Sequence, residues 1–448
     1  MKATSFLNGL LFGIVGEQFD TVATPQLASI EQFNVVGQLG GAAPYKQFPG
    51  YGIWPDLPEE AELLQVQYIG RHGERFPTKG SGASYKTAID KLDGLQLNGS
   101  LAALQDYKYF VTDASQYGLE TTANNTNGNI YSGELSAKRN GAVFREKYAS
   151  LYNPELELPV FTSGSQRVHD TALNFIAGFG AENVKLNIIS EDASMGGNSL
   201  TPKKGCDDYN TYGDGGKFEF DQFYDEVTER LMNDNPNANL TADDVEALFA
   251  ACAYEINVEG KATICSIFSI DELIKSEYSD DLDLYYNYGA GNNYTRAIGS
   301  VYTKAQLELL KEESDNKIWL SFTHDDDIVT YYSSLGFFDD PVLPKDKLLF
   351  RKTFSKSVII PQSTRLILEK YAMNNETYVR WILNDAVLPL EQCANGPGFG
   401  CQIDQYIDIM EQRVENYDFN EFCGTDGADE ISFFWDYNTT VYNATLKV

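Results

Sequence analysis

Three short apolar runs along the chain are each followed by a polar turn and then by a stretch of helical periodicity. The runs are 63–69, 158–163 and 318–323, and each has the length of one buried strand. After the second run, apolar residues recur at the spacing of one helix face: Val168, Ala172, Phe175, Ile176 and Phe179. This alternation of strand and helix predicts an α/β sheet.

Charged and titratable residues stand where each of these runs ends. Arg71 and His72 follow the first run, Arg167 follows the second, and His324 follows the third, ahead of three consecutive Asp residues at 325–327. In open α/β sheets, ligands bind beyond the carboxyl ends of the strands, so we expect these side chains to share one site. A helix should follow His324, with one of the three Asp residues as its N-cap.

The polar stretches between the runs have helical periodicity. Residues 239–245, Asn-Leu-Thr-Ala-Asp-Asp-Val, have the composition of a capped helix start. Nearer the C-terminal end, 365–369 and 378–383 flank Met-Asn-Asn-Glu and predict a β-hairpin. We expect the catalytic cleft to lie between two discontinuous units, an α/β catalytic domain and an α-helical lobe. The expected bounds are 17–82, 155–205 and 312–448 for the former, and 83–154 and 206–311 for the latter.

The charge of the chain limits its partners. Its 448 residues include 34 Lys and Arg against 65 Asp and Glu, which gives a formal net charge of −31. Such a field repels nucleic acid and anionic membrane surfaces, so we expect neither as a partner. An anionic substrate would need a local cationic pocket, or a pH low enough to discharge carboxylates. Solubility alone would also explain the acidity, and the oligomeric state is not predicted.

Cysteine and asparagine patterns favour the secretory pathway. The chain has six Cys without a CxxC pair, and an even number favours disulfides. Asn-x-Ser/Thr sequons make the following residues candidate glycosylation sites: Asn98, Asn124, Asn239, Asn293, Asn375, Asn438 and Asn443. Residues 1–16 have the size of a signal peptide, with an N-terminal arm as the alternative. No segment reaches the length of a membrane span, so we expect a secreted protein.

The residues that carry chemistry favour a phosphate ester as substrate. Only three His residues occur, and two of them, His72 and His324, stand at strand ends. Guanidinium groups nearby match phosphate oxygens and keep their charge at any pH. A His nucleophile divides ester hydrolysis into two steps, and an Asp can protonate the leaving alcohol. With so few His and no paired ligand motif, we expect no metal and no cofactor.

The segment Arg71-His72-Gly73-Glu74-Arg75-Phe76-Pro77 resembles the RHGxRxP signature of the histidine acid phosphatases, and His324-Asp325 resembles their distal HD pair. The resemblance covers most of the chain, from Gly-Gly-Ala-Ala-Pro-Tyr at 40–45 to Ser-Phe-Phe-Trp-Asp at 432–436. It is greatest with secreted acid phosphatases and phytases of yeasts and fungi. It implies a phosphoglycerate-mutase-like fold, in which a mixed central sheet has helices on both faces and an α-helical lobe.

The resemblance also implies roles for these residues. His72 would be the nucleophile that forms a phosphohistidine, and Asp325 would be the proton donor to the leaving group. The phosphate oxygens would be bound by Arg71, Arg75, Arg167 and His324. Gly73 would keep the backbone tight behind the nucleophile, whereas His169 matches no catalytic position. The two Asp residues after Asp325 favour a raised pKa for its carboxyl, although a helix N-terminus would lower that pKa.

The resemblance further implies a disulfide pairing, which the cysteine count alone leaves open. The pairs would be Cys206–Cys423, Cys252–Cys265 and Cys393–Cys401. One departure is visible, because many relatives carry a Cys shortly before the first motif, where this chain has Ala61. The even count that remains indicates that its partner is absent too, which affects stability rather than chemistry.

The main prediction is a secreted acid phosphatase for phosphate monoesters, and the alternative is a phytase. Phytases of this family often carry several Lys just after the first motif, where this chain offers Lys79 and Lys86 as candidate substrate-binding residues. A mutase-type phosphotransferase is disfavoured by the secretion signals and the distal HD pair. A non-catalytic glycoprotein is disfavoured because every residue of both motifs is present. A glycosidase is disfavoured because the Asp and Glu residues show no distinguishing pattern.

Overall fold

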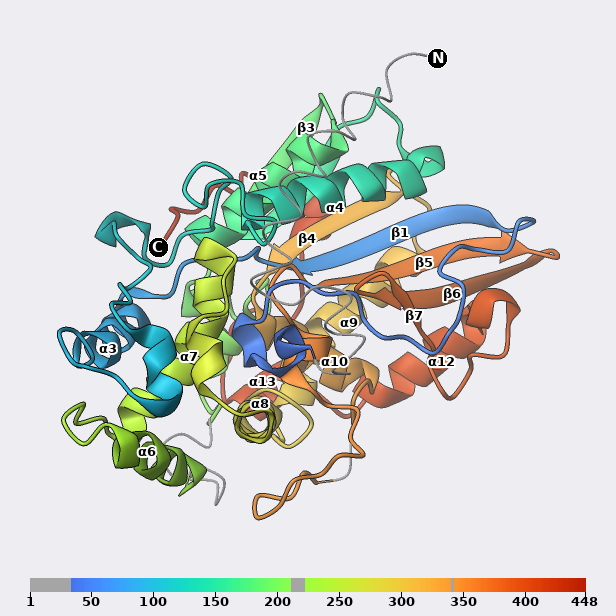
Figure 1. Cartoon of the computed structure of the whole chain (residues 1–448). Coiled ribbons are helices and arrows are strands. Elements are labelled where there is room, and N and C mark those ends of the chain that lie inside the picture. The colour runs from blue at the N-terminus through green and yellow to red at the C-terminus, as the bar shows by residue number, and fades with distance from the viewer. Residues whose placement is uncertain (1–33, 211–221, 340–341) are drawn as a thin grey trace.

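The computed structural model describes residues 34–210, 222–339 and 342–448 (Figure 1). Its centre is an eight-stranded sheet with the strand order β3-β2-β4-β1-β5-β6-β7, in which β8 pairs with β6. The strands are β1 (Glu62–Arg71), β2 (Leu158–Ser163), β3 (Val184–Ile189), β4 (Ile318–Thr323), β5 (Arg365–Met373), β6 (Glu376–Leu383), β7 (Ala386–Leu388) and β8 (Cys401–Gln402). The expected signal remnant or arm at 1–16 lies outside the described residues.

The sheet is mixed, as the resemblance implies. β1 to β4 pair in parallel, whereas β5 to β8 extend the sheet in antiparallel pairs. β2 and β4 are buried along their whole length, which is typical of parallel strands covered on both faces. Arg71 lies opposite Thr323, and Thr162 lies opposite Phe322, so β1, β2 and β4 end at the same edge. The polar turns that follow these three strands therefore meet.

The antiparallel part begins with the predicted β-hairpin. β5 and β6 pair from Leu366–Leu383 to Met373–Glu376. The two turn residues, Asn374 and Asn375, both have positive φ, a conformation that Asn tolerates better than most residues. The sheet is thus assembled from segments near both ends of the chain, because β5 lies directly beside β1.

Helices cover both faces of the sheet. α4 (Gly133–Lys147) and α5 (Gln166–Phe179) pack on one face, where the Tyr68 ring lies 5.6 Å from Phe144 and 5.2 Å from Phe175 between centroids. α9 (Thr295–Lys311), α10 (Asp325–Leu335) and α12 (Ile403–Val414) cover the other face, where Gln67 donates to the carbonyl oxygen of Gln306. Figure 1 shows α4 above the sheet and α10 and α12 below it. The predicted fold class is therefore confirmed.

A separate group of helices lies beyond the carboxyl end of β1 (Figure 1). α3 (Lys79–Asp90), α6 (Phe223–Asp234) and α7 (Ala242–Glu259) share one apolar core, which the start of α8 (Ile270–Asn287) joins. The predicted helix start is present, because Thr241 and Asp244 form a capping box at α7. The packing differs from the expected domain bounds at α4 and α9, which lie on the sheet instead of in this lobe.

Shorter elements complete the fold. The remaining α-helices are α11 (Lys356–Ile359), α13 (Phe419–Cys423) and α14 (Phe433–Asp436). Short 3-10 helices occupy Val35–Gln38, Gly40–Ala42, Gly99–Leu104, Ala114–Gln116, Ala149–Leu151, Ala193–Met195, Pro202–Gly205, Ile264–Ile267 and Pro397–Phe399. The disulfides are the three that the resemblance implies: Cys206–Cys423, Cys252–Cys265 and Cys393–Cys401. In the described part of the chain, no helix combines the length and apolarity that crossing a bilayer requires.

One buried ion pair inside the sheet allows a stability prediction. Arg380 of β6 lies opposite Glu369 of β5, both side chains are fully buried, and Nε lies 2.5 Å from Oε2. Arg380→Met leaves that carboxylate with only Lys147 as a charged partner, so we expect the free energy of unfolding to fall by about 3 kcal/mol. Urea denaturation at neutral pH measures the loss. Adding Glu369→Gln removes the uncompensated charge and should recover part of the lost stability. A double variant that is less stable than Arg380→Met alone would contradict this explanation.

Candidate active site

His72 is placed by the end of β1. Its backbone N–H donates to the carbonyl oxygen of Thr323, which ties it to the end of β4, and its side chain is buried. Nδ1 lies 2.9 Å from the carbonyl oxygen of Gly73. Because a carbonyl oxygen only accepts, the hydrogen is on Nδ1, and Nε2 keeps its lone pair. The imidazole therefore presents Nε2 as a nucleophile without needing a base.

The surroundings also keep this imidazole uncharged. Burial lowers the pKa of His72 well below its usual value, and the positive charges of Arg167, Arg71 and Arg75 lower it further. A neutral His72 in acid follows, and only the neutral form has a lone pair on Nε2. The site is thus suited to nucleophilic attack at a pH where an ordinary histidine would be protonated.

Three guanidinium groups surround His72, and each is anchored on one side. Nη1 of Arg71 donates to the carbonyl oxygens of Gly41 and Ile360, both at 2.6 Å. Nη1 of Arg75 donates to the carbonyl oxygen of Phe76 at 2.9 Å. The Nε–H groups of Arg71, Arg75 and Arg167 are all buried and have no hydrogen-bond partner within the described residues. Buried hydrogen-bond donors without a partner destabilise a fold. Three such Nε–H donors around one imidazole therefore indicate an anion-binding site.

His324 joins this anion-binding site from the end of β4, and its ring centroid lies 5.9 Å from that of His72. Nη2 of Arg167 lies 3.2 Å from Nδ1 of His324, and Nε2 of His324 lies 2.8 Å from Oε1 of Glu191. Because a guanidinium only donates, Nδ1 accepts and the hydrogen is on Nε2. Glu191 therefore orients His324, and Lys204 holds Glu191 in turn at 2.5 Å. Sequence reasoning missed Glu191, which follows β3 without a distinguishing pattern.

The carboxyl of Asp325 has a lowered pKa. Burial raises the pKa of its carboxyl, but nearby positive charges, above all those of Arg71 and Lys356, outweigh burial and lower it to about 2. The nearest of these is Arg71, whose Nη2 lies 2.9 Å from Oδ2. The sequence left open whether crowding would raise this pKa or the helix N-terminus would lower it, and the pKa is lowered, while Asp326 pairs with Lys203. Of the three consecutive Asp residues, Asp327 has the raised pKa, because burial raises the pKa of its carboxyl to about 7.

The helix start at this point differs from expectation. α10 begins at Asp325, with His324 in the N-cap position, and no side chain caps the helix. The three Asp residues therefore occupy its first turn, where carboxylates interact favourably with the unpaired backbone N–H groups. This placement turns His324 toward the sheet edge and Asp325 toward Arg71.

The turn behind His72 has no space for a side chain at Gly73. A Cβ there would lie 2.3 Å from Oε1 of Glu120 and 2.9 Å from Cα of Gly133. The backbone N–H of Gly73 donates to Oγ1 of Thr171 at 2.8 Å, and Thr171 contacts Glu120 at 2.5 Å. Burial raises the pKa of Glu120 to about 8. Thr171 and Glu120, which the sequence did not indicate, therefore hold the nucleophile turn in place.

The remaining predicted residues lie outside this cluster. Lys79 is exposed at the first residue of α3, and Lys86 pairs with Asp90 at 2.5 Å, so their role in substrate binding stays a prediction. The ring of His169 lies 3.3 Å from its neighbour Asp170, measured from Nδ1 to Oδ1. The seven sequon Asn residues are all exposed, as glycosylation requires.

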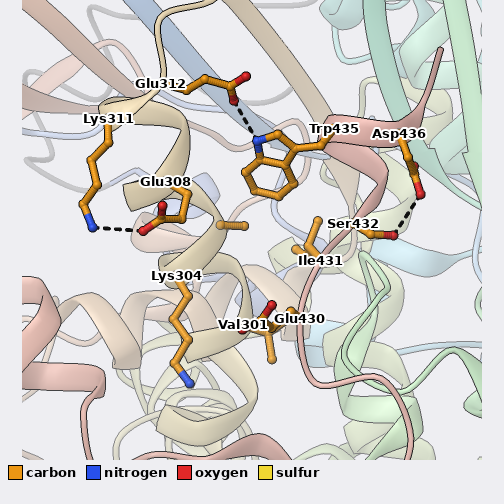
Figure 2. Close-up of a pocket in the computed structure, with 11 residues that line it drawn as sticks. Val301, Lys304, Glu308, Lys311, Glu312, Glu430, Ile431, Ser432, Trp435 and Asp436 are labelled. Atoms are coloured by element: carbon orange, nitrogen blue, oxygen red, sulfur yellow. Dashed lines mark hydrogen bonds and ion pairs between the residues drawn. The ribbon is translucent and has the colours of Figure 1, made fainter. Parts of the chain in front are cut away.

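A second cavity does not suit a phosphate ester. It has a volume of about 640 Å³ and lies between α9 and residues 430–436 (Figure 2). Its two ammonium groups are engaged, since Lys311 pairs with Glu308 at 2.9 Å and Lys304 donates to the carbonyl oxygen of Tyr417. The carboxyl groups that line it are Glu308, Glu312, Glu430 and Asp436. Its charge opposes an anionic ligand, which favours the cluster around His72 as the active site.

Comparison with known proteins agrees with the geometry. Residues 62–384 match the family model described as histidine phosphatase superfamily (branch 2). A phytase of Candida albicans is 44% identical, with 98% of each chain covered, and the constitutive acid phosphatase of Saccharomyces cerevisiae is 40% identical, with 95% of this chain and 96% of the relative covered. The crystal structure of the phytase from D. castellii superposes with a TM-score of 0.91 at 45% identity over 96% of each chain. The chain therefore belongs to the histidine phosphatase superfamily, branch 2, and is an enzyme of its acid phosphatase and phytase group.

Proposed function

We propose that this chain is a secreted acid phosphatase in which His72 attacks the phosphorus of a monoester and carries the phosphoryl group on Nε2. The observation that supports this most is the combination at one point of a free Nε2 lone pair and three buried guanidinium groups with unpaired Nε–H donors. Those donors stabilise the negative charge of the transferring phosphoryl oxygens, and they need no reorganisation during the reaction.

Two steps follow from this arrangement. In the first, the bond from phosphorus to Nε2 of His72 forms as the bond to the ester oxygen breaks, and the proton of Asp325 passes to the leaving oxygen. In the second, Asp325 takes a proton from water, whose oxygen displaces Nε2 and releases inorganic phosphate. Arg71, Arg75 and Arg167 hold the phosphoryl oxygens throughout, and His324, which the resemblance implies as a further phosphate ligand, keeps Arg167 in place between these oxygens and Glu191. A neutral His72 attacks with the lone pair of Nε2, and because Nδ1 keeps its hydrogen, the phosphorylated ring is a cation that leaves as neutral imidazole in the second step.

The low pKa of Asp325 in the free enzyme has a consequence for this mechanism. The ion pair with Arg71 keeps its carboxyl ionised in mild acid, so a proton has to arrive with the substrate. A bound phosphate shares the charge of Arg71 and brings negative charge close to Asp325, and both effects raise the pKa of the carboxyl. The monoanion of a phosphate ester, which prevails below a pH of about 6, also carries a proton of its own. Acid conditions therefore favour the reactive complex.

Secretion rests on separate observations. The seven sequons are exposed, and three disulfides link the chain, which is typical of proteins that mature in the secretory pathway. The net charge of −31 would repel an anionic ester at neutral pH, and a mildly acidic exterior would discharge part of it.

Phytase activity is the second candidate function, because relatives named phytase are as similar as those named acid phosphatase. We expect the purified enzyme to hydrolyse p-nitrophenyl phosphate at mildly acidic pH, and kcat/KM for phytate measured beside it decides between the two candidates. A preference for phytate would make the chain a phytase, and a preference for the small ester would make it a general acid phosphatase. No turnover of either ester would contradict the proposed function.

A further inference from the structure

We propose that Lys447 forms a second anion subsite beside the anion-binding site around His72, which binds another phosphate group of a multiply phosphorylated polyol. This inference rests on the proposed function of the same cleft, and it names the substrate class and a specificity-determining residue. Lys447 lies far from both motifs in the sequence, next to the last residue of the chain as given.

The backbone of Lys447 is fixed at the sheet edge that carries the active site. Its N–H donates to the carbonyl oxygen of Gly164 at 2.9 Å, and its own carbonyl oxygen accepts from the N–H of Gln166 at 2.8 Å. These two bonds form a parallel β-bridge across Ser165. Arg167 is the next residue of α5, so Lys447 and Arg167 are positioned by the same turn. Two further backbone hydrogen bonds link Ile188 of β3 to Tyr442 and Ala444. They fix the segment that precedes Lys447.

A cavity joins Lys447 to the reacting groups. It has a volume of about 320 Å³, and the residues that line it include Arg167, His324 and Asp325 as well as Ser165 and Lys447. A molecule that places one phosphate against the guanidinium groups therefore has room to extend along this cavity. Because Lys447 lines the same cavity, its ammonium group is the candidate ligand for a second anionic substituent of that molecule.

The charges that line the cavity leave Lys447 available for an anion. Each ionised carboxylate there has a cationic partner: Asp325 pairs with Arg71, Asp326 with Lys203, and Glu191 with Lys204 and His324. Asp327 is buried and has a pKa raised to about 7, so it is uncharged in mild acid. Among the described residues, the carboxylate that interacts electrostatically with Lys447 is that of Asp192, which is exposed and accepts from the N–H of Ser194. Among the described residues that line this cavity, Arg167 and Lys447 are the cations that form no ion pair with its lining carboxylates, and both favour phosphate.

The test compares a substrate that reaches the second subsite with one that does not. Lys447→Ala is expected to lower the ratio of kcat/KM for phytate to kcat/KM for p-nitrophenyl phosphate about tenfold, as loss of one charge-assisted contact predicts. Lys447→Arg should restore most of the ratio. Lys185→Ala removes an equal charge from neighbouring β3, where Lys185 lies over the Tyr437 ring, and is the matched control, with the wild-type ratio expected.

Calorimetric binding of phytate to the His72→Ala variant separates this proposal from the proposed function. Adding Lys447→Ala to that variant should raise Kd about tenfold even though no turnover takes place. An unchanged Kd and an unchanged kcat/KM ratio would overturn the subsite, as would an equal fall in the Lys185→Ala control. Failure of the wild-type enzyme to hydrolyse p-nitrophenyl phosphate would instead overturn the phosphatase mechanism, and the binding measurement would still decide on the subsite.

Discussion

Replacing His72 by alanine is expected to lower kcat/KM for every phosphate ester by at least about 10⁴-fold, because the atom that bonds to phosphorus is removed. The guanidinium groups would remain and would still bind phosphate, so the loss should be in kcat rather than in KM. The decisive measurement is the covalent intermediate. Wild-type enzyme mixed with a radiolabelled ester and quenched in alkaline denaturant should retain label on the protein, since phosphohistidine survives base, whereas the variant should retain none.

His169→Ala is the matched control for this experiment. His169 lies in α5, where its ring pairs with Asp170 and matches no catalytic position, so its loss should leave labelling at the wild-type level. The thermal midpoint of His72→Ala should be measured too, because the N–H of His72 ties β1 to β4 through the backbone and survives the substitution. A folded His72→Ala variant that still acquires label would show that another group is the nucleophile.

Asp325→Asn is expected to have the second largest effect, and the effect should depend on the leaving group. Esters of simple alcohols need a proton on the departing oxygen, so their kcat should fall about 10²–10⁴-fold. p-Nitrophenyl phosphate releases a stabilised phenolate and should slow far less. Measuring kcat for glycerol 2-phosphate beside p-nitrophenyl phosphate gives the ratio that tests this role.

The control for Asp325→Asn addresses its ion pair with Arg71. Loss of that pair alone would disturb both esters equally, so equal slowing would show that Asp325 positions Arg71 and does not supply the proton. Asp326→Asn removes a carboxylate from the same helical turn and should keep the wild-type ratio between the esters.

The choice of pH for this comparison follows from the low pKa of Asp325. The folded pKa lies near 2, below the ordinary value of 3.8, so the pair stabilises the fold above that value and loses its effect as the pH falls toward 2. In mild acid the stability difference between variant and wild type is therefore constant. A change in the ratio of kcat for the two esters then reflects proton transfer to the leaving group.

The α/β class and the meeting point of the two motifs were predictable from local pattern. Each apolar run has the length and composition of a buried strand, and parallel strands share a carboxyl edge, so residues that follow β1, β2 and β4 come together whatever their separation in sequence. The hairpin of β5 and β6 and the capped start of α7 were equally local, because turn and cap preferences act over a few residues.

The extent of the helical lobe was not predictable from the same patterns. α4 and α9 have the periodicity of any amphipathic helix. Their sequences do not predict which apolar surface each helix packs against. Their burial against the sheet is decided by which faces remain open once the strands have paired. The expected bounds assign these two helices to the lobe, whereas in the structure they pack on the sheet.

The sequence by itself determined the candidate catalytic residues, because His72, the guanidinium groups and the HD pair stand in or near short motifs at strand ends. Only the tertiary structure decided their ionisation and their neighbours. Crowding along the chain suggested a raised pKa for Asp325, but Arg71 reaches it from another strand and reverses the sign. Glu191 and Lys447 likewise come from distant segments. Electrostatic energy depends on the distance between charges in space. The sequence predicts that distance only for residues within one or two helical turns of each other.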